Sequence, residues 1–167
     1  MTVENDLFKL DFTVCKLVRY HSKRQAFFEN SGKAFNVFNI VAGSATCVGV
    51  LGTHQSLAAF GAMLIAIFAA VDLVVGFDKK ARQYESLKRR YIELQKCMRL
   101  GEETLENLKA WTSERLDIQR DEPHGLTALE VACANEESIA RGIPGNVKVI
   151  DPIQRCLKQY WSYQIFK

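Results

Sequence analysis

The sequence predicts an all-α integral membrane protein, in which one two-helix transmembrane hairpin lies between largely helical cytosolic segments. Three observations predict this class. Residues 34–71 form a run of 38 consecutive residues without Asp, Glu, Lys or Arg. Small and polar residues interrupt this apolar run near its middle, and basic residues flank it on both sides. Outside the run, apolar residues recur at the three- and four-residue spacing of helices that pack as a bundle.

Residues 1–33 are expected to form a cytosolic amphipathic lead-in helix. The residues that predict its buried face recur at spacings of three and four, and they are Leu7, Leu10, Val14, Leu17 and His21. Asn30, Ser31 and Gly32 are expected to break this helix just before the apolar run.

The apolar run is long enough for two membrane spans. One span needs roughly 17 to 25 helical residues, so residues 34–77 are expected to form a hairpin of two helices, 34–51 and 57–77, with a turn at 52–56. A hairpin buried in a soluble protein is the alternative, but helices of soluble proteins carry a polar face and these carry hardly any. Basic residues flank both spans and the turn has no charge, so the positive-inside tendency places both termini in the cytosol.

Residues 78–167 are expected to form a cytosolic helical domain. Its first helix carries a heptad seam. The seam consists of Tyr84, Leu87, Tyr91, Leu94 and Met98, and Leu105 and Leu108 resume it after Gly101. It predicts either a coiled coil or packing against the lead-in helix of the same chain. A short helix is expected from Leu126 to about Gly142, and a last amphipathic helix after Asp151.

Both spans carry small residues through which helices approach closely in lipid. In the second span the candidates for helix packing are Ala58, Ala62, Ala66 and Ala70. Polar groups at membrane depth are costly unless they face water or a partner. The candidates for lining a pore are Asn36, Asn39, Gly43, Thr46 and Asp72. A two-span chain cannot enclose a pore alone, so conduction requires several copies. The alternatives are hydrogen bonds within one hairpin and, for Asp72, an interface position beside Lys33 or Lys79.

A basic cluster directly after the second span is the candidate site for a nucleotide or for anionic lipid. Its members are Lys79, Lys80, Arg82, Lys88, Arg89 and Arg90. Phosphate contacts need only well-placed cations, whereas lipid headgroups alone explain cations next to a span. The sequence does not decide between a nucleotide and anionic lipid as the ligand.

The sequence carries no motif for catalysis, for a phosphate-binding loop or for a metal site. Its five cysteines are an odd number and include no closely spaced pair. Its three histidines have no convincing partners for acid–base chemistry. We therefore expect no enzymatic activity, no cofactor and no metal.

Several features between residues 15 and 142 are similar to those of one known family. They are His21-Ser22-Lys23-Arg24, the short-turn hairpin, the helix with Tyr84, Leu87, Tyr91 and Leu94, and Glu122-Pro123 followed by Leu129-Glu130-Val131-Ala132-Cys133-Ala134-Asn135-Glu136. In these features the chain resembles the SLATT family, the two-transmembrane domains found beside SMODS nucleotidyltransferases and SLOG proteins in bacterial conflict systems.

The resemblance implies an effector of bacterial anti-phage defence of the abortive-infection type. Such a protein is expected to oligomerise in the inner membrane and to form a gated, ion-conducting pore that disrupts it. Control is expected from a nucleotide or oligonucleotide that a partner nucleotidyltransferase makes. The alternative is a non-conducting membrane anchor or scaffold that recruits a cytosolic partner.

Overall fold

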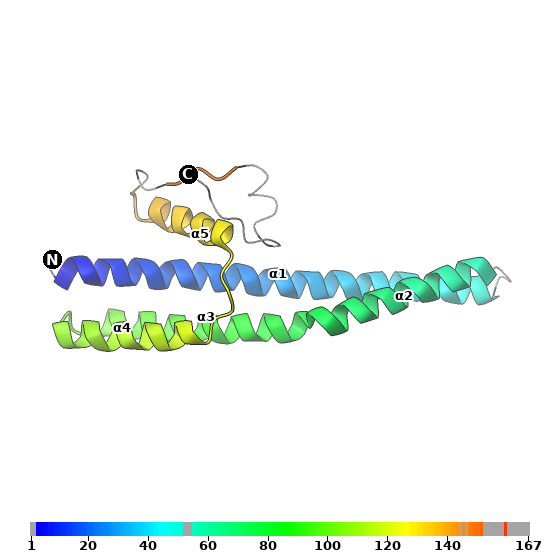
Figure 1. Cartoon of the computed structure of the whole chain (residues 1–167), viewed down its shortest axis with the longest axis horizontal. Helices are drawn as coiled ribbons and strands as arrows, with labels where there is room; N and C mark the ends of the chain where they lie inside the picture. Colours follow the sequence, from blue (N-terminus) through cyan, green and yellow to red (C-terminus); the bar gives the residue numbers. More distant parts are fainter. Residues whose placement is uncertain (1–2, 52–54, 144, 146, 152–158, 160–167) are drawn as a thin grey trace. The chain divides into compact units, whose positions relative to one another are not determined.

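The computed structural model describes residues 3–51, 55–143, 145, 147–151 and 159. Over these residues the protein is all-helical, as predicted (Figure 1). The helices are α1 (Val3–Leu51), α2 (Gln55–Val75), α3 (Phe77–Leu100), α4 (Leu105–Arg120) and α5 (Thr127–Ala140). The chain divides into two compact units, Met1–Arg24 with Tyr84–Lys167, and Gln25–Gln83. We call them the bundle unit and the hairpin unit.

The core of the bundle unit is built by α1 and α3, whose apolar residues follow the predicted spacing. The buried apolar side chains of α1 in this unit are Leu10, Val14, Leu17 and Tyr20, and those of α3 are Tyr84, Leu87, Tyr91, Leu94 and Met98. The imidazole of His21 stacks on the ring of Tyr91, with 5.4 Å between their centroids and 11° between their planes. The seam of α3 therefore packs against the lead-in part of α1 in the same chain.

The chain turns between α3 and α4, so the predicted continuation of the seam through Leu105 and Leu108 is wrong. α3 ends at Leu100, and α4 begins after a four-residue turn. Gly101 makes room for this turn, because a methyl group on its Cα would lie only 2.6 Å from Cζ2 of the buried Trp111. The indole thus occupies the space that a side chain at position 101 would need.

In Figure 1, α5 lies on the opposite side of α1 from α3 and α4. Its bounds agree with the short helix predicted from Leu126 to about Gly142. Its apolar face buries Ala128, Leu129, Ala132 and Cys133. The side chain of Asn135 in α5 holds the chain beyond the helix, because it donates to the carbonyl oxygen of Lys148 at 2.7 Å and accepts from the N–H of Lys148 at 2.8 Å. The helix predicted after Asp151 falls on residues that, except Gln159, lie outside those described.

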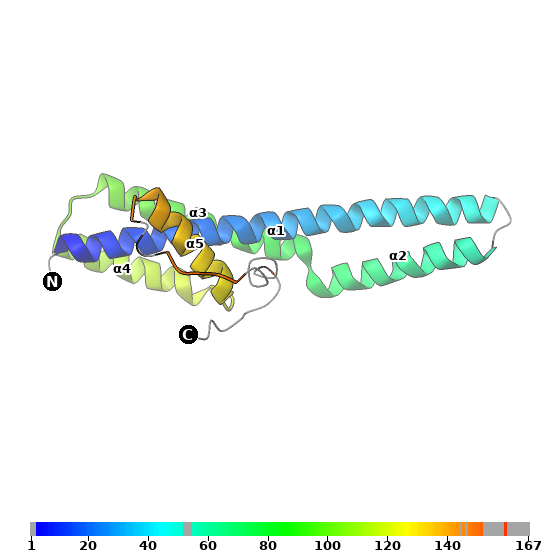
Figure 2. The same ribbon diagram turned by 90° about the horizontal axis from the view of Figure 1, so that it is seen from above.

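The hairpin unit consists of the later part of α1, of α2, and of the first residues of α3 (Figure 2). The break predicted at Asn30, Ser31 and Gly32 is wrong, because α1 continues through these residues. Tertiary packing overrides their weak helix propensity. Gly32 is buried, and a methyl group there would make an ordinary van der Waals contact, 3.5 Å from Cβ of Phe77.

The second helix of the hairpin is displaced by two residues from the predicted 57–77. α2 begins at Gln55 and ends at Val75. Gly76 ends it with a φ of +62°, a conformation that glycine adopts without steric cost. Of the predicted turn 52–56, residues 52–54 lie outside the described residues, and Gln55 and Ser56 are helical.

Within the described part of the chain, one helical stretch is long and apolar enough to cross a membrane, judged by length and composition. It lies in Ala58–Leu100 and therefore includes most of α2. The mean hydropathy of its apolar window is 2.4, and 6% of that window is buried. A core helix of a soluble protein would bury most of such a window.

Candidate functional site

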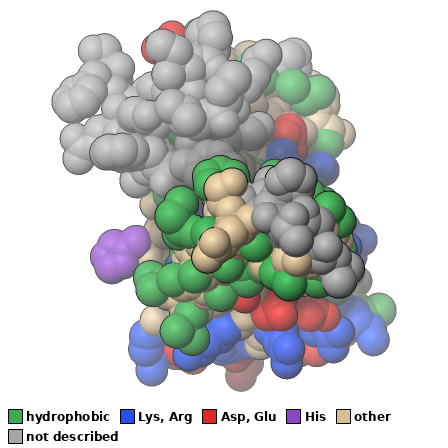
Figure 3. Space-filling model, turned by 90° about the vertical axis from the view of Figure 1, so that its right-hand side faces the viewer, with side chains coloured by type: hydrophobic (Ala, Val, Ile, Leu, Met, Phe, Trp, Pro, Cys, Tyr) green, Lys and Arg blue, Asp and Glu red, His purple; other side chains and the backbone are tan. Residues whose placement is uncertain are grey.

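The hairpin unit exposes large apolar side chains along both of its long helices. On α1 these are Val37, Phe38, Ile40, Val41, Val48 and Val50, and on α2 they are Phe60, Met63, Ile67, Val71, Leu73 and Val74. Their exposed fractions run from 37% at Val71 to 86% at Leu73. Figure 3 looks onto the hairpin end and shows hydrophobic side chains, in green, gathered there. A contiguous apolar surface of this kind marks a contact with lipid or protein.

Two kinds of contact hold α1 and α2 together. Near the ends of the two helices that face the loop, Gly61 lies against Ala42 and Thr46. A methyl group on Gly61 would overlap Oγ1 of Thr46 and would lie 3.0 Å from the carbonyl oxygen of Ala42. At the other end, phenylalanine rings fill the space, with centroids 4.8 to 6.4 Å apart. These rings belong to Phe28, Phe35, Phe38, Phe68 and Phe77.

The four alanines predicted for helix packing do not make this contact within the hairpin. Ala62, Ala66 and Ala70 are exposed, and Ala58 is partly exposed. Gly61 takes the contact position, and one residue rotates a helix by about 100°. The alanine row therefore lies on a side of α2 that α1 of the same chain leaves open, and its use in packing between copies stays a prediction.

Two of the pore-lining candidates lie near α2. The hydroxyl of Thr46 donates to the carbonyl oxygen of Ala42 at 2.9 Å and lies against Gly61. Asn39 is partly buried, and its Oδ1 atom is buried without a hydrogen-bond partner among the described atoms. Thr46 thus belongs to the packing of the hairpin, whereas Asn39 carries an unsatisfied acceptor.

The other three candidates are open to the surroundings of the hairpin. Asn36 and Asp72 are exposed, and a methyl group on Gly43 would meet nothing within 4 Å. Among the residues that the structure describes, no ion pair joins Asp72 to Lys33 or Lys79.

The basic cluster predicted to bind a nucleotide or anionic lipid is divided among different partners. In the hairpin unit, Lys79 and Arg82 are exposed, and the ammonium of Lys80 lies 5.5 Å from the ring centroid of Phe28. In the bundle unit, Arg89 pairs with Glu85 at 2.6 Å and Arg90 with Asp121 at 2.5 Å. Lys88 also belongs to the bundle unit. The six cations therefore do not form one binding site in which every member is available to a ligand.

The bundle unit contains a buried polar cluster that the sequence did not predict. His21 is 1% exposed, and its Nε2 lies 2.9 Å from Oε1 of Glu122. Burial, together with the nearby Glu122 carboxylate, raises the pKa of Tyr91, on which His21 stacks. Beside it, the hydroxyl of Tyr20 accepts from the N–H of Leu126 at 3.0 Å, and burial raises the pKa of Tyr20 to about 12. The sequence offered one signal for this buried cluster, because His21 lies on the apolar face of the lead-in helix.

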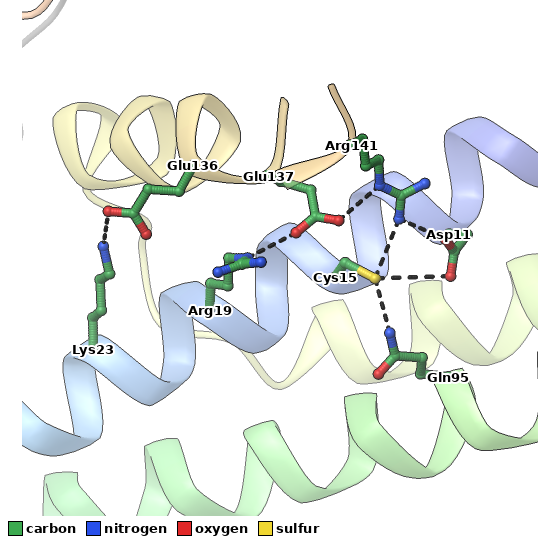
Figure 4. Close-up of polar contacts among 8 residues, drawn as sticks. All are labelled: Asp11, Cys15, Arg19, Lys23, Gln95, Glu136, Glu137 and Arg141. Atoms are coloured by element: carbon green, nitrogen blue, oxygen red, sulfur yellow. Dashed lines mark hydrogen bonds and ion pairs between the residues drawn. The ribbon is translucent and has the colours of Figure 1, made fainter. Parts of the chain in front are cut away.

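A second polar network joins α1 to α5 (Figure 4). The carboxylate of Glu137, 5% exposed, accepts from Nε of Arg19 and from Nε of Arg141, each at 2.7 Å. Burial opposes ionisation of Glu137, but the hydrogen bonds from the two guanidinium groups outweigh it and lower its pKa. Arg141 also pairs with Asp11 at 2.5 Å. The four-residue spacing of Glu137 and Arg141 was a local signal for their pair, but their partners on α1, Arg19 and Asp11, are remote in the chain and had none.

Cys15 lies within this network. Its Sγ accepts from Nε2 of Gln95 at 2.8 Å and from Nη2 of Arg141 at 3.3 Å. Burial and the Asp11 carboxylate raise the pKa of the Cys15 thiol, so the thiol form is favoured. Over the described residues, no group of three or more His, Cys, Asp or Glu side chains could hold a metal ion.

Comparison of the chain with models of protein families, with curated proteins and with solved structures finds no match.

Proposed function

We propose that this chain is an integral membrane protein whose hairpin spans the bilayer of a bacterial inner membrane, with both termini in the cytosol. The exposed apolar side chains on both helices of the hairpin carry this proposal. Transfer of one large apolar side chain from water is worth about 1.5–3 kcal/mol when it is fully buried. A dozen partly exposed ones therefore favour lipid by on the order of 10 kcal/mol or more. The small buried fraction of the apolar window in Ala58–Leu100 supports the same proposal.

Within this class, we propose a SLATT-like effector of anti-phage defence, in which several copies assemble into a gated pore that disrupts the membrane. Asn36 and Asp72 support this part, because they are exposed among the large apolar side chains of the hairpin. Facing lipid alone, such groups would cost several kcal/mol. Around the axis of an oligomer they would face water or one another.

In this proposal a nucleotide or oligonucleotide controls the pore. The exposed cations Lys79 and Arg82 are available for a phosphate group or an anionic lipid headgroup. The cytosolic helical part that follows the second span is expected to receive the signal.

A non-conducting anchor or scaffold is the second candidate. It is favoured by exposed apolar side chains on the bundle unit, where Leu100 is 77% exposed, Leu105 55% and Leu116 51%. Such side chains suit a protein partner. This candidate predicts that substitutions at the pore-lining positions are tolerated.

The test measures membrane potential and viability in bacteria that express the chain with its neighbouring genes during phage infection. The variants Asn39→Leu and Asp72→Leu are compared with Val41→Leu, a matched change on the apolar surface. Membrane abundance and oligomer size are held equal. Depolarisation by the wild type and by Val41→Leu, but not by the other two variants, is the expected result. A silent wild type, or equal depolarisation by every variant, would favour the scaffold.

A further inference from the structure

A groove in the bundle unit lies between the first turns of α1 and the end of α3. Its volume is about 380 Å³. Four of its lining residues recur along α1 at spacings of three and four, so they share one face of that helix. They are Glu4, Leu7, Phe8 and Asp11. The end of α3 and the turn after it line the other side. We call this the α1–α3 groove.

The apolar part of the lining includes an exposed aromatic ring. Met98 of α3 is 7% exposed, and Leu7 of α1 is partly exposed. Phe8 is 45% exposed, although phenylalanine is among the residues most often buried. The guanidinium of Arg141 lies 5.2 Å from the ring centroid of Phe8. The ring therefore already accepts a cation from its own chain and still has surface for a second contact.

The charged part of the lining is mainly negative. Glu4 and Glu103 are exposed, and among the described residues neither carboxylate makes an ion pair. The carboxylate of Asp11 pairs with Arg141 at 2.5 Å. Arg99, which is exposed, is the one cation among the described residues that line the groove. Three carboxylates thus face one guanidinium, and two of them lack a counter-ion in the described part of the chain.

We propose that the α1–α3 groove is a docking site for a basic, partly apolar segment of another protein. An Arg or Lys side chain of that segment lies against Phe8, with its charged group between Glu4 and Glu103. An apolar neighbour in the segment fills the space beside Leu7 and Met98. This inference goes beyond the proposed function, because docking in the bundle unit needs neither a pore nor a nucleotide.

Charge complementarity selects this occupant. Carboxylates without counter-ions repel phosphate groups, so they oppose binding of a nucleotide or an anionic lipid headgroup. Over the described residues, no group of three or more His, Cys, Asp or Glu side chains could hold a metal ion. The complementary charge therefore belongs to an organic cation, and guanidinium and ammonium groups form strong, charge-assisted hydrogen bonds with carboxylates.

The apolar lining favours the side chains of a peptide over a small, fully polar cation. Arg and Lys bury an apolar stem while their charged heads stay at the rim, and both bind the face of an aromatic ring. The flexible side chain of Met98 adapts to the shape of such a stem. The volume of the groove lies near the lower end of the range for ligand sites, which suits a few side chains of an extended or helical segment.

Methyl NMR of the full chain tests this inference. The chain has three methionines; Met98 lines the groove, whereas Met63 lies in the hairpin unit and serves as an internal control. The chain, isotope-labelled at its methionine methyl groups, is placed in phosphatidylcholine nanodiscs and titrated with the peptide acetyl-Leu-Arg-Leu-Arg-Leu-amide. A saturable shift of the Met98 signal, with no shift of Met63, is expected. The same peptide with citrulline, a neutral analogue of arginine, should bind about tenfold more weakly.

Matched variants assign this binding to the groove. The double variant Glu4→Gln with Glu103→Gln is expected to bind the arginine peptide about three- to tenfold more weakly. Phe8→Leu keeps an apolar side chain but removes the aromatic face, and it should weaken binding about two- to fivefold. Glu93→Gln with Glu114→Gln is the control, because these exposed carboxylates line a different groove, and it should leave the affinity unchanged.

Several results would overturn the inference. They are the absence of a saturable Met98 shift at millimolar peptide, equal affinity for the citrulline peptide, and equal affinities of the two double variants. A Met98 shift that depends on the concentration of the chain without peptide would assign the groove to a second copy. A Met98 shift with inorganic triphosphate would assign it to a phosphate ligand. A chain that stays in solution without lipid is titrated in the same way, so failure of the membrane proposal leaves this test intact.

Discussion

Replacing Glu137 by Gln should release α5 from α1. The Glu137 side chain is 7% exposed and receives hydrogen bonds from Arg19 and Arg141, each at 2.7 Å. An amide of the same shape keeps one acceptor oxygen but turns an NH₂ group toward the other guanidinium. The variant therefore loses a charge-assisted hydrogen bond and leaves a partly buried cation without its counter-ion.

The expected loss of docking free energy in Glu137→Gln follows from how exposed Arg19 and Arg141, the two partners of Glu137, are to water. Removing one member of a buried ion pair costs about 3–5 kcal/mol. Arg19 is 42% exposed, so water screens its share, and Arg141 keeps its contact with Asp11. We therefore expect α5 to lose about 2–4 kcal/mol of docking free energy.

Hydrogen exchange of the α5 amides in the full-length protein measures this local opening. Since 1.4 kcal/mol is a factor of ten, protection should fall roughly 30- to 700-fold. Glu136→Gln is the matched control, because its pair with Lys23 is more exposed, at 43% and 30% for the two side chains, and should matter less than about fivefold. Unchanged protection in Glu137→Gln, or an equal loss in Glu136→Gln, would refute the reasoning.

Two further predictions concern the bundle unit. Because the pKa of Glu137 is lowered in the folded state, its contribution to stability is present above the ordinary glutamate range near pH 4 and is lost as the pH falls through the folded pKa. Protection of the α5 amides, corrected for intrinsic exchange, should therefore fall more with acid in the wild type than in Glu137→Gln, which keeps the other α1–α5 ion pairs. Gly101→Ala should strain the turn between α3 and α4 by about 1–3 kcal/mol, because the new methyl group meets Trp111. The midpoint temperature of thermal unfolding of this variant, followed by tryptophan fluorescence, should therefore be lower than that of the wild type. An unchanged midpoint would contradict the proposed role of Gly101.

Several features of the fold could be predicted because their signal is local in the sequence. The spacing of Leu10, Val14 and Leu17 predicted a buried face of α1, and these side chains are buried. The spacing of the α3 seam predicted its buried residues in the same way. The turn at Gly101 was not predicted, because a glycine in a helical pattern does not reveal that Trp111 occupies the adjacent space.

The candidate site was predicted in part. The run of uncharged residues at 34–71 predicted the two apolar helices, and the exposed side chains of the hairpin unit are consistent with it. The alanine spacing in α2 did not predict the contact with α1, because rotation about the helix axis by one residue decides between Gly61 and Ala62. Only the packed hairpin fixes that rotation.

By itself, the sequence determined that the chain is helical and which stretch of it is free of charge, since helix periodicity and composition are properties of neighbouring residues. The tertiary structure alone decided which polar groups meet. His21 and Glu122 lie 101 positions apart, and Arg19 and Glu137 lie 118 apart. Such pairs depend on how helices dock, and docking is set by the shapes of many side chains at once, which no local pattern encodes.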